Sequence, residues 1–260
     1  MNVQYVEAAG KRVPVRIEGE GPGLLLVHGT GATGDANFGH LLESFTPDHT
    51  TIVPDYAGSD DDTADPGEFA LDQLVEQVVA AARAAELDEP VDVVGYSLGA
   101  VVTAAAAAKY PNLFRRVVLV AGWVTMDPRQ RLVFDLWRRL ADTDPQAYSR
   151  FVTMLLFTRS FMNGLGDAGL EEAASGTGFT PATLRQIDLN SRIDISDSVG
   201  DVVAPTLVIG CSHDQLIPVE HARQLHQAIG QSDYVELESG HLVVVEKSDE
   251  LVKHISEFLK

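Results

Sequence analysis

A serine in the middle of the chain lies where the local pattern could make its hydroxyl a nucleophile. Ser97 is the central residue of the pentapeptide Gly95–Gly99, which follows the apolar run 91–94 and leads into an alanine-rich helical stretch at 100–109. A sharp turn from strand to helix strains the central residue, and glycines on either side let strand and helix approach without Cβ clashes. We therefore expect Ser97 on a nucleophile elbow, the alternative being a chance match in a loop.

A serine hydroxyl is a weak nucleophile, so it needs a base within hydrogen-bonding distance and a carboxylate that orients the base. Asp214 follows the apolar run 206–209, and His241 follows the run 234–237. Taken singly, the aspartate could cap the next helix, and the histidine is one of 8 in the chain. The order serine, aspartate, histidine, each directly after a strand, favours a catalytic triad of Ser97, Asp214 and His241.

Such a triad also needs donors for a developing oxyanion, and these are usually backbone amides held in loops. The apolar run 23–27 leads into His28–Gly31, where two glycines let the main chain approach a substrate closely. We predict that the amides of Thr30 and Leu98 form the oxyanion hole. The alternative is that 28–31 is only a flexible connection.

Predicted strands and helices alternate along the chain, and these elements must bring the candidate residues together. Two extended stretches, at 3–8 and 12–18, predict an opening antiparallel hairpin. Continuous apolar runs then alternate with helical repeats, which is typical of a parallel sheet buried on both faces. The runs lie at 23–27, 50–53, 91–94, 116–120, 206–209 and 234–237, and helical repeats at 71–82, 219–229 and 251–259. This alternation predicts an α/β fold.

One interval, residues 125–203, interrupts the alternation because it contains helical patches and no convincing strand. We predict a helical cap over the carboxyl edge of the sheet, where open α/β sheets bind ligands, and a core made of 1–124 and 204–260. A helical appendage away from any site is the alternative. The helical patches lie at 129–141, 146–158 and 181–190, with glycine-containing loops expected at 163–166 and 175–178.

Apolar and aromatic side chains in and beside this interval are candidates for the wall of a substrate pocket. Side chains of this kind also pack helices onto sheets, so both roles stay open. A pocket built from them would favour an uncharged, fairly apolar acyl or ring-bearing substrate over a polyanion. The candidates are Trp123, Phe134, Trp137, Met154, Phe157, Phe161 and Met162.

Composition narrows the class of partner to a small-molecule substrate. The chain of 260 residues has 38 acidic and 19 basic residues, a net charge of −19, which disfavours nucleic acid and anionic membrane surfaces. No apolar run approaches the roughly 20 residues that span a bilayer. Residues 1–10 lack the features of a signal peptide, and the one cysteine, Cys211, excludes an intramolecular disulfide. We expect a cytoplasmic enzyme, with homodimer formation left open.

The predicted chemistry calls for no metal and no cofactor. The acidic cluster Asp60–Asp62 is the candidate for a carboxylate metal site. We expect it to be a solvated loop and not a metal site, since nothing nearby supplies a second set of ligands.

The order of these motifs resembles that of the α/β-hydrolase superfamily over nearly the whole chain. The matching parts are His28-Gly29 after the third strand, the elbow at 95–99, Asp214 in the loop 210–218, and Ser239-Gly240-His241 before a terminal helix. The resemblance implies an eight-stranded, mostly parallel sheet with a helical cap after the sixth strand. It also implies Ser97, His241 and Asp214 as nucleophile, base and orienting carboxylate.

One departure concerns the segment after the fourth strand. Many relatives carry a basic, glycine-rich turn there, whereas residues 54–60 keep Asp55 and Gly58 and then become acidic. Any function that depends on this turn is therefore in doubt.

Three classes of function remain open at this point. The first is hydrolysis of a small ester, lactone or thioester through an acyl-enzyme on Ser97. The second is another reaction on the same fold, such as carbon–carbon cleavage, acyl transfer or a cyclisation in secondary metabolism. The third is a ligand-binding receptor that retains the pocket with little turnover. The complete set of triad residues favours the first.

Overall fold

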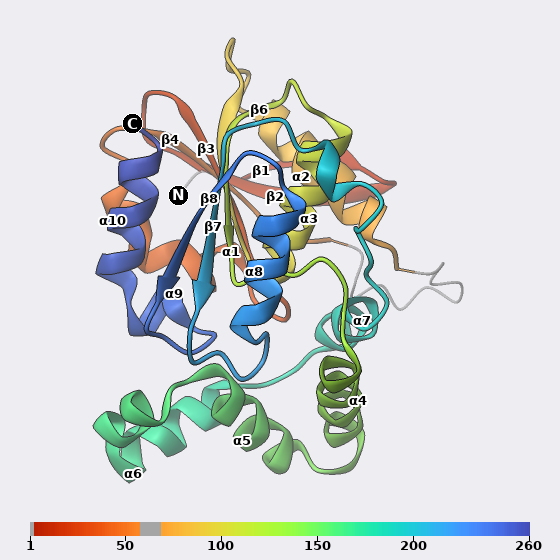
Figure 1. Ribbon diagram of the computed structural model, residues 1–260, viewed down its shortest axis with the longest axis vertical. Coiled ribbons are helices and arrows are strands. Elements are labelled where there is room, and N and C mark those ends of the chain that lie inside the picture. The colour runs from red at the N-terminus through yellow and green to blue at the C-terminus, as the bar shows by residue number, and fades with distance from the viewer. Residues whose placement is uncertain (1–2, 58–68) are drawn as a thin grey trace.

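The computed structural model describes residues 3–57 and 69–260, and an eight-stranded sheet runs through its centre (Figure 1). The strand order is β1-β2-β4-β3-β5-β6-β7-β8. Only the β1–β2 and β2–β4 pairs are antiparallel, so the predicted mostly parallel α/β sheet is confirmed. The strands are β1 Val3–Ala8, β2 Lys11–Glu18, β3 Gly23–Val27, β4 Thr50–Pro54, β5 Val91–Tyr96, β6 Phe114–Val120, β7 Thr206–Cys211 and β8 Ser232–Leu237.

Helices cover both faces of the sheet, which explains why its central strands are continuous apolar runs. On β5 every residue is buried; Val93 belongs to the core on one face and Val94 to the core on the other. One face packs against α2 Leu71–Ala84, α3 Leu98–Lys109 and α8 Val219–Ala228. The other packs against α1 Gly34–Phe38, the 3-10 helix η1 Gly39–Ser44, α9 Val243–Glu246 and α10 Ser248–Phe258.

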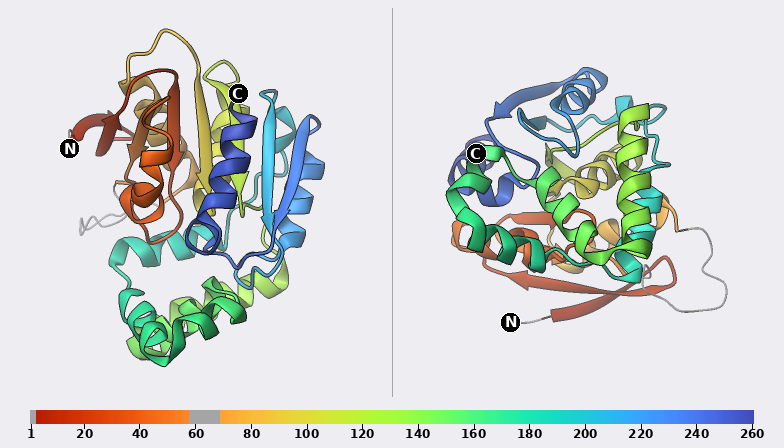
Figure 2. Two further views of the ribbon diagram at one scale, coloured as in Figure 1. Left: turned by 90° about the vertical axis from the view of Figure 1, so that its left-hand side faces the viewer. Right: turned by 90° about the horizontal axis from the view of Figure 1, so that it is seen from below.

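Four helices follow β6 and lie across the carboxyl end of the sheet (Figure 2). Local sequence fixes where three of them begin, because an oxygen-bearing residue precedes a proline at the first helical position. Asp127 caps α4, Asp144 caps α5 and Thr180 caps α7 in this way. The helices are α4 Pro128–Thr143, α5 Pro145–Leu156, α6 Arg159–Gly176 and α7 Pro181–Asn190; a 3-10 turn, η2 Val199–Asp201, leads back toward β7.

Two local predictions need correction. The loop expected at 163–166 lies inside α6, where Gly166 with φ +67° forms a kink between two helical parts. The loop expected at 175–178 begins later, because α6 continues to Gly176. In addition, α1 and η1 occupy 34–44, where the sequence pattern indicated no element; Thr33 caps α1 by accepting from the amide of Ala36.

Within the described ranges, none of the helices combines the length and the apolar character needed to cross a membrane. The acidic cluster Asp60–Asp62 and the turn residue Gly58 lie outside the described residues, so the prediction of a solvated acidic loop stays a prediction.

Candidate active site

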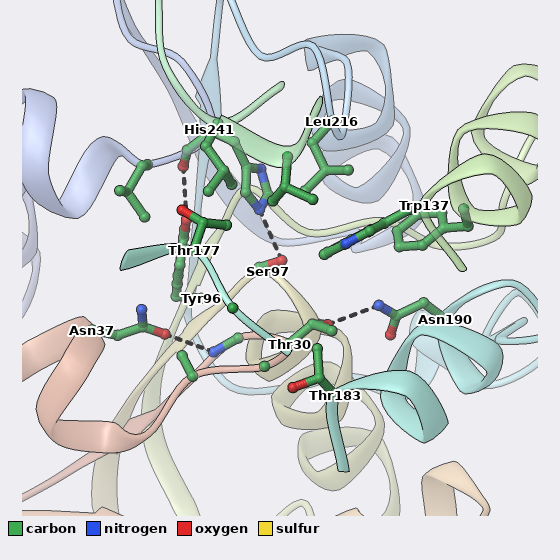
Figure 3. Close-up of a pocket in the computed structure, with 18 of the residues that line it drawn as sticks. Thr30, Asn37, Tyr96, Ser97, Trp137, Thr177, Thr183, Asn190, Leu216 and His241 are labelled. Carbon is green, nitrogen blue, oxygen red and sulfur yellow. Dashed lines mark hydrogen bonds between the residues drawn. The ribbon is translucent and has the colours of Figure 1, made fainter. Parts of the chain in front are cut away.

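Three side chains from distant parts of the chain, those of Ser97, His241 and Asp214, meet at the carboxyl edge of the sheet; Figure 3 shows the first two. Nε2 of His241 lies 2.9 Å from Oγ of Ser97, and Nδ1 of His241 lies 2.6 Å from Oδ2 of Asp214. Since a carboxylate accepts the Nδ1–H, the lone pair of Nε2 faces the serine hydroxyl. Nε2 can therefore take the hydroxyl proton as Oγ of Ser97 attacks a substrate, and can later return that proton to a leaving group.

The backbone at Ser97 has the strain expected of a nucleophile elbow. Its φ of 57° and ψ of −120° are rare for a residue with a side chain. A Cβ on Gly95 would lie 2.3 Å from the carbonyl oxygen of Gly99, and a Cβ on Gly99 would lie 2.1 Å from that of Val27. Glycine is required at both positions because β5, α3 and β3 come this close together, and the crowding raises Ser97 above the sheet.

Asp214 is held by its own loop. Its side chain is fully buried, and Oδ1 accepts from the amides of Leu216 at 2.9 Å and Ile217 at 2.7 Å. These two bonds leave Oδ2 for His241, and they fix the position of the carboxylate that orients the ring.

The amides of Thr30 and Leu98 both belong to segments that border Ser97. Neither donates a hydrogen bond to another of the described residues, so both are free to meet an oxygen in the site. The loop comes very close to the nucleophile: a Cβ on Gly29 would lie 3.1 Å from Cβ of Ser97. The amide of Gly29 itself is held by Oδ1 of Asn37 on α1, at 2.9 Å.

A cavity of about 200 Å³ opens above the nucleophile. Ser97 and His241 line its floor, and Phe134 and Trp137 of α4 contribute to its wall. None of the described residues that line it is an aspartate, glutamate, lysine or arginine. The cavity therefore suits an uncharged group.

The other candidates for the pocket wall do not line this cavity, which corrects the prediction. Trp123 is fully buried in the core, and Met154 is 54% exposed. Phe157 and Phe161 stack on each other with ring centroids 5.1 Å apart. Phe157 and Met162 border one separate groove and Phe161 borders another, both between the start of α6 and the loop after β7.

The physical reason is the helical period of α5. Tyr148, Val152 and Leu156 follow each other at four-residue spacing and face the cavity. Met154 is two positions from Val152, about 200° around the helix, and so faces outward. Hydrophobicity alone does not distinguish these two faces.

Three polar residues of α7 were not predicted, of which Thr183 and Asn190 line the cavity. Thr183, Gln186 and Asn190 lie on the buried face of α7 and contact the loop 28–31. The sequence gives a weak signal, since their spacing of three and four residues places them on one helix face, but polar residues with that spacing usually face solvent.

Cys211 lies near Asp214 but is a packed thiol. It is buried at the end of β7, and burial raises the pKa of its thiol, as do the carboxylates of Asp214 and Glu246. In the ranges 3–57 and 69–260, no group of three or more histidine, cysteine, aspartate and glutamate residues is placed to hold a metal ion.

Comparisons with known proteins agree with this architecture. A family model described as the alpha/beta hydrolase fold matches residues 22–248. A relative from Xenorhabdus hominickii, named pyrrolizixenacetamide deacetylase, is 38% identical over 260 residues, which is 98% of this chain and 97% of that protein.

Solved structures show the same fold at lower identity. An enol-lactonase from Burkholderia xenovorans superposes with a TM-score of 0.84 and 22% identity, covering 98% of this chain and 99% of that one. An esterase from Exiguobacterium antarcticum superposes with a TM-score of 0.83 and 17% identity, again covering 98% and 99%. On the match to the family model and to the deacetylase, this chain belongs to the α/β-hydrolase fold family and is a hydrolase of that fold.

Proposed function

We propose that the protein hydrolyses a short acyl group from a small, fairly apolar molecule through an acyl-enzyme on Ser97. The observation that carries the proposal is the 2.9 Å contact between Nε2 of His241 and Oγ of Ser97 at the floor of an uncharged cavity. A nucleophile paired with an oriented base is the arrangement that acyl transfer requires.

The reaction follows from the positions of the groups. Oγ of Ser97 attacks the substrate carbonyl while Nε2 of His241 takes the proton, and the amides of Thr30 and Leu98 bind the tetrahedral oxyanion. The imidazolium then protonates the leaving alcohol or amine, and the acyl group stays on Oγ. A water molecule, deprotonated by His241, attacks the acyl-enzyme; the acyl–Oγ bond breaks, the imidazolium returns the proton to Oγ of Ser97, and the acid is released.

The size and lining of the cavity support a small acyl group. Its volume of about 200 Å³ is below the range of pockets that enclose drug-sized ligands. The similar protein from Xenorhabdus is named a deacetylase, so acetyl is the acyl group we propose. The leaving group is an alcohol, thiol or amine on an uncharged, apolar body.

The test uses a series of p-nitrophenyl esters from acetate to octanoate, together with p-nitroacetanilide. We expect turnover of the acetyl compounds, a decline with chain length, and an acetylated Ser97 peptide in mass spectra of enzyme quenched during turnover. Ser97→Ala should lower kcat by about 10⁴-fold or more. Undiminished turnover by Ser97→Ala, or the absence of both turnover and adduct in the natural protein, would overturn the proposal.

A further inference from the structure

The helix α7 contacts the loop that precedes α1 through two hydrogen bonds. Oε1 of Gln186 accepts from the amide of Gly31 at 2.7 Å, and Nδ2 of Asn190 donates to Oγ1 of Thr30 at 2.8 Å. Figure 3 shows Asn190 reaching Thr30 beside Ser97. The residues joined in this way are 155 and 160 positions apart in the chain.

The side chains that α7 contributes to these contacts are buried, whereas Gly31 is exposed and Thr30 is half-buried. Gln186 is 3% exposed and Asn190 is 1% exposed. Gly31 has φ +69°, and a Cβ at this position would lie 2.8 Å from Cγ2 of Thr183. The helix therefore packs directly on the loop, and without the Gln186 acceptor the amide of Gly31 would lose its bond to α7.

The two peptide groups that flank the amide of Thr30 are held from opposite sides. Asn37 of α1 accepts from the amide of Gly29, and Gln186 of α7 accepts from the amide of Gly31. A peptide unit is planar, so the backbone has only two soft torsions per residue. Fixing both neighbouring peptides restricts the direction of the N–H of Thr30, which itself has no acceptor among the described residues.

From this arrangement we propose that Gln186 and Asn190 are positioning residues of the oxyanion hole, so that the hole is complete only when α7 is docked on the loop. The inference rests on the proposed function. It gives the helices between β6 and β7 a part in the chemical step, in addition to covering the substrate.

The first test replaces Gln186 by methionine, which has a similar volume and no acceptor for the Gly31 amide. A misaligned donor stabilises the transition state less than before and leaves ground-state binding nearly unchanged. With p-nitrophenyl acetate we expect kcat to fall about 10- to 100-fold and KM to stay within about twofold.

A second readout separates positioning from folding. A trifluoromethyl ketone forms a tetrahedral oxyanion on the serine, whereas the corresponding alcohol cannot. Gln186→Met should weaken inhibition by the ketone by the same factor as kcat and leave inhibition by the alcohol unchanged. The matched control is Ile187→Val, which trims a buried side chain of the same helix without touching the loop and should retain kcat and both affinities.

Thr30→Val is an independent variant, because it removes the hydroxyl that accepts from Asn190 and keeps the backbone amide. We expect a fall in kcat of about 3- to 10-fold, again with little change in KM. If Gln186→Met melts below the assay temperature, Gln186→Asn takes its place, since the shorter amide cannot reach Gly31.

An unchanged kcat in the Gln186 variant of an active enzyme would overturn this inference alone, as would equal losses of ketone and alcohol affinity. Failure of the natural protein to show Ser97-dependent turnover would instead overturn the proposed function.

Discussion

The hydroxyl of Tyr96 donates a hydrogen bond of 2.9 Å to the backbone carbonyl of His241 (Figure 3). The residue before the nucleophile therefore holds the loop that carries the base. Both residues are buried, and their rings lie 5.4 Å apart. The elbow positions two members of the triad, one through its own strained backbone and one through this bond.

Tyr96→Phe removes the bond and leaves a buried carbonyl without its partner. Loss of one such hydrogen bond costs about 1–2 kcal/mol. If the whole of this free energy is lost from transition-state stabilisation, because the imidazole is less well positioned, kcat/KM should fall about 5- to 30-fold. Tyr110→Phe removes a tyrosine hydrogen bond to Glu76, at the far end of α3, and should leave kcat/KM unchanged. Equal kcat/KM values for the two variants would show that the loop needs no support from Tyr96.

Asp214→Asn tests the orientation of the imidazole. An amide at this position keeps the shape of the side chain but presents an N–H to Nδ1, which favours the wrong tautomer of His241. We expect kcat on p-nitrophenyl acetate to fall by about 10⁴-fold, with KM little changed. The urea midpoints of the variant and the natural protein should also be compared. If the midpoints are similar, the loss of activity comes from the chemical step and not from unfolding. A residual activity within tenfold of the natural protein would contradict the role of Asp214.

The strands and the meeting of the three triad residues could be predicted because their signals are local. Continuous apolar runs identify buried strands, and the residue after each strand is placed at the same sheet edge by topology alone. Ser97, Asp214 and His241 needed no knowledge of how helices pack. The extent of α6 was missed for the opposite reason: Gly164 and Gly166 favour a loop locally, whereas in the folded chain only Gly166 departs from helical torsions, at the kink within α6.

The pocket wall depends on which face of each helix turns inward, and the sequence does not specify this. Met154 and Val152 are both apolar residues of α5, yet Val152 lines the cavity and Met154 is exposed. Gln186 and Asn190 look like residues of a solvent-facing helix until α7 is placed against the loop 28–31. Contacts between residues so far apart in sequence depend on tertiary packing and leave no local pattern.

Glu246 of α9 joins the start of α6 to the loop of the base. Its carboxylate accepts from the amide and hydroxyl of Thr158, at 2.6 and 2.9 Å, and from the amide of Gly240 at 3.4 Å. Glu246→Ala removes an acceptor shared by these donors. We expect the free energy of unfolding in urea to fall by about 1–3 kcal/mol.

The matched control is Glu250→Ala, because among the described residues Glu250 pairs only with Lys247, at 4.0 Å on the surface. Such a pair contributes little, so this variant should unfold within about 0.5 kcal/mol of the natural protein. If both alanine variants unfold alike, the carboxylate of Glu246 does not stabilise this junction.

His28 provides a prediction about pH. The ring is buried; Nδ1 lies 2.8 Å from the carbonyl of Gly29, and Nε2 accepts from the amide of Tyr56 at 3.2 Å. Burial lowers the pKa of His28, so the folded protein keeps a neutral ring with its proton on Nδ1. In the unfolded chain the ring has an ordinary pKa of about 6.5 and binds a proton more readily.

The sign of the effect follows from this difference. Above about pH 6.5 neither state binds the proton, so the full stability is present. As the pH falls below about 6.5, the His28 ring binds a proton in the unfolded chain but stays neutral in the folded protein. The free energy of unfolding therefore decreases by up to about 1.4 kcal/mol per pH unit. Urea unfolding between pH 5 and 8 should therefore show a smaller decrease on acidification for His28→Gln, whose amide can still accept from Tyr56 and donate to Gly29. Burial also lowers the pKa of His221, but this residue is present in both proteins, so its contribution cancels when the two curves are subtracted. Curves that run parallel from pH 8 to 5 would show that His28 titrates alike in the folded and unfolded states, and that the ring does not need to be neutral to hold the loops after β3 and β4.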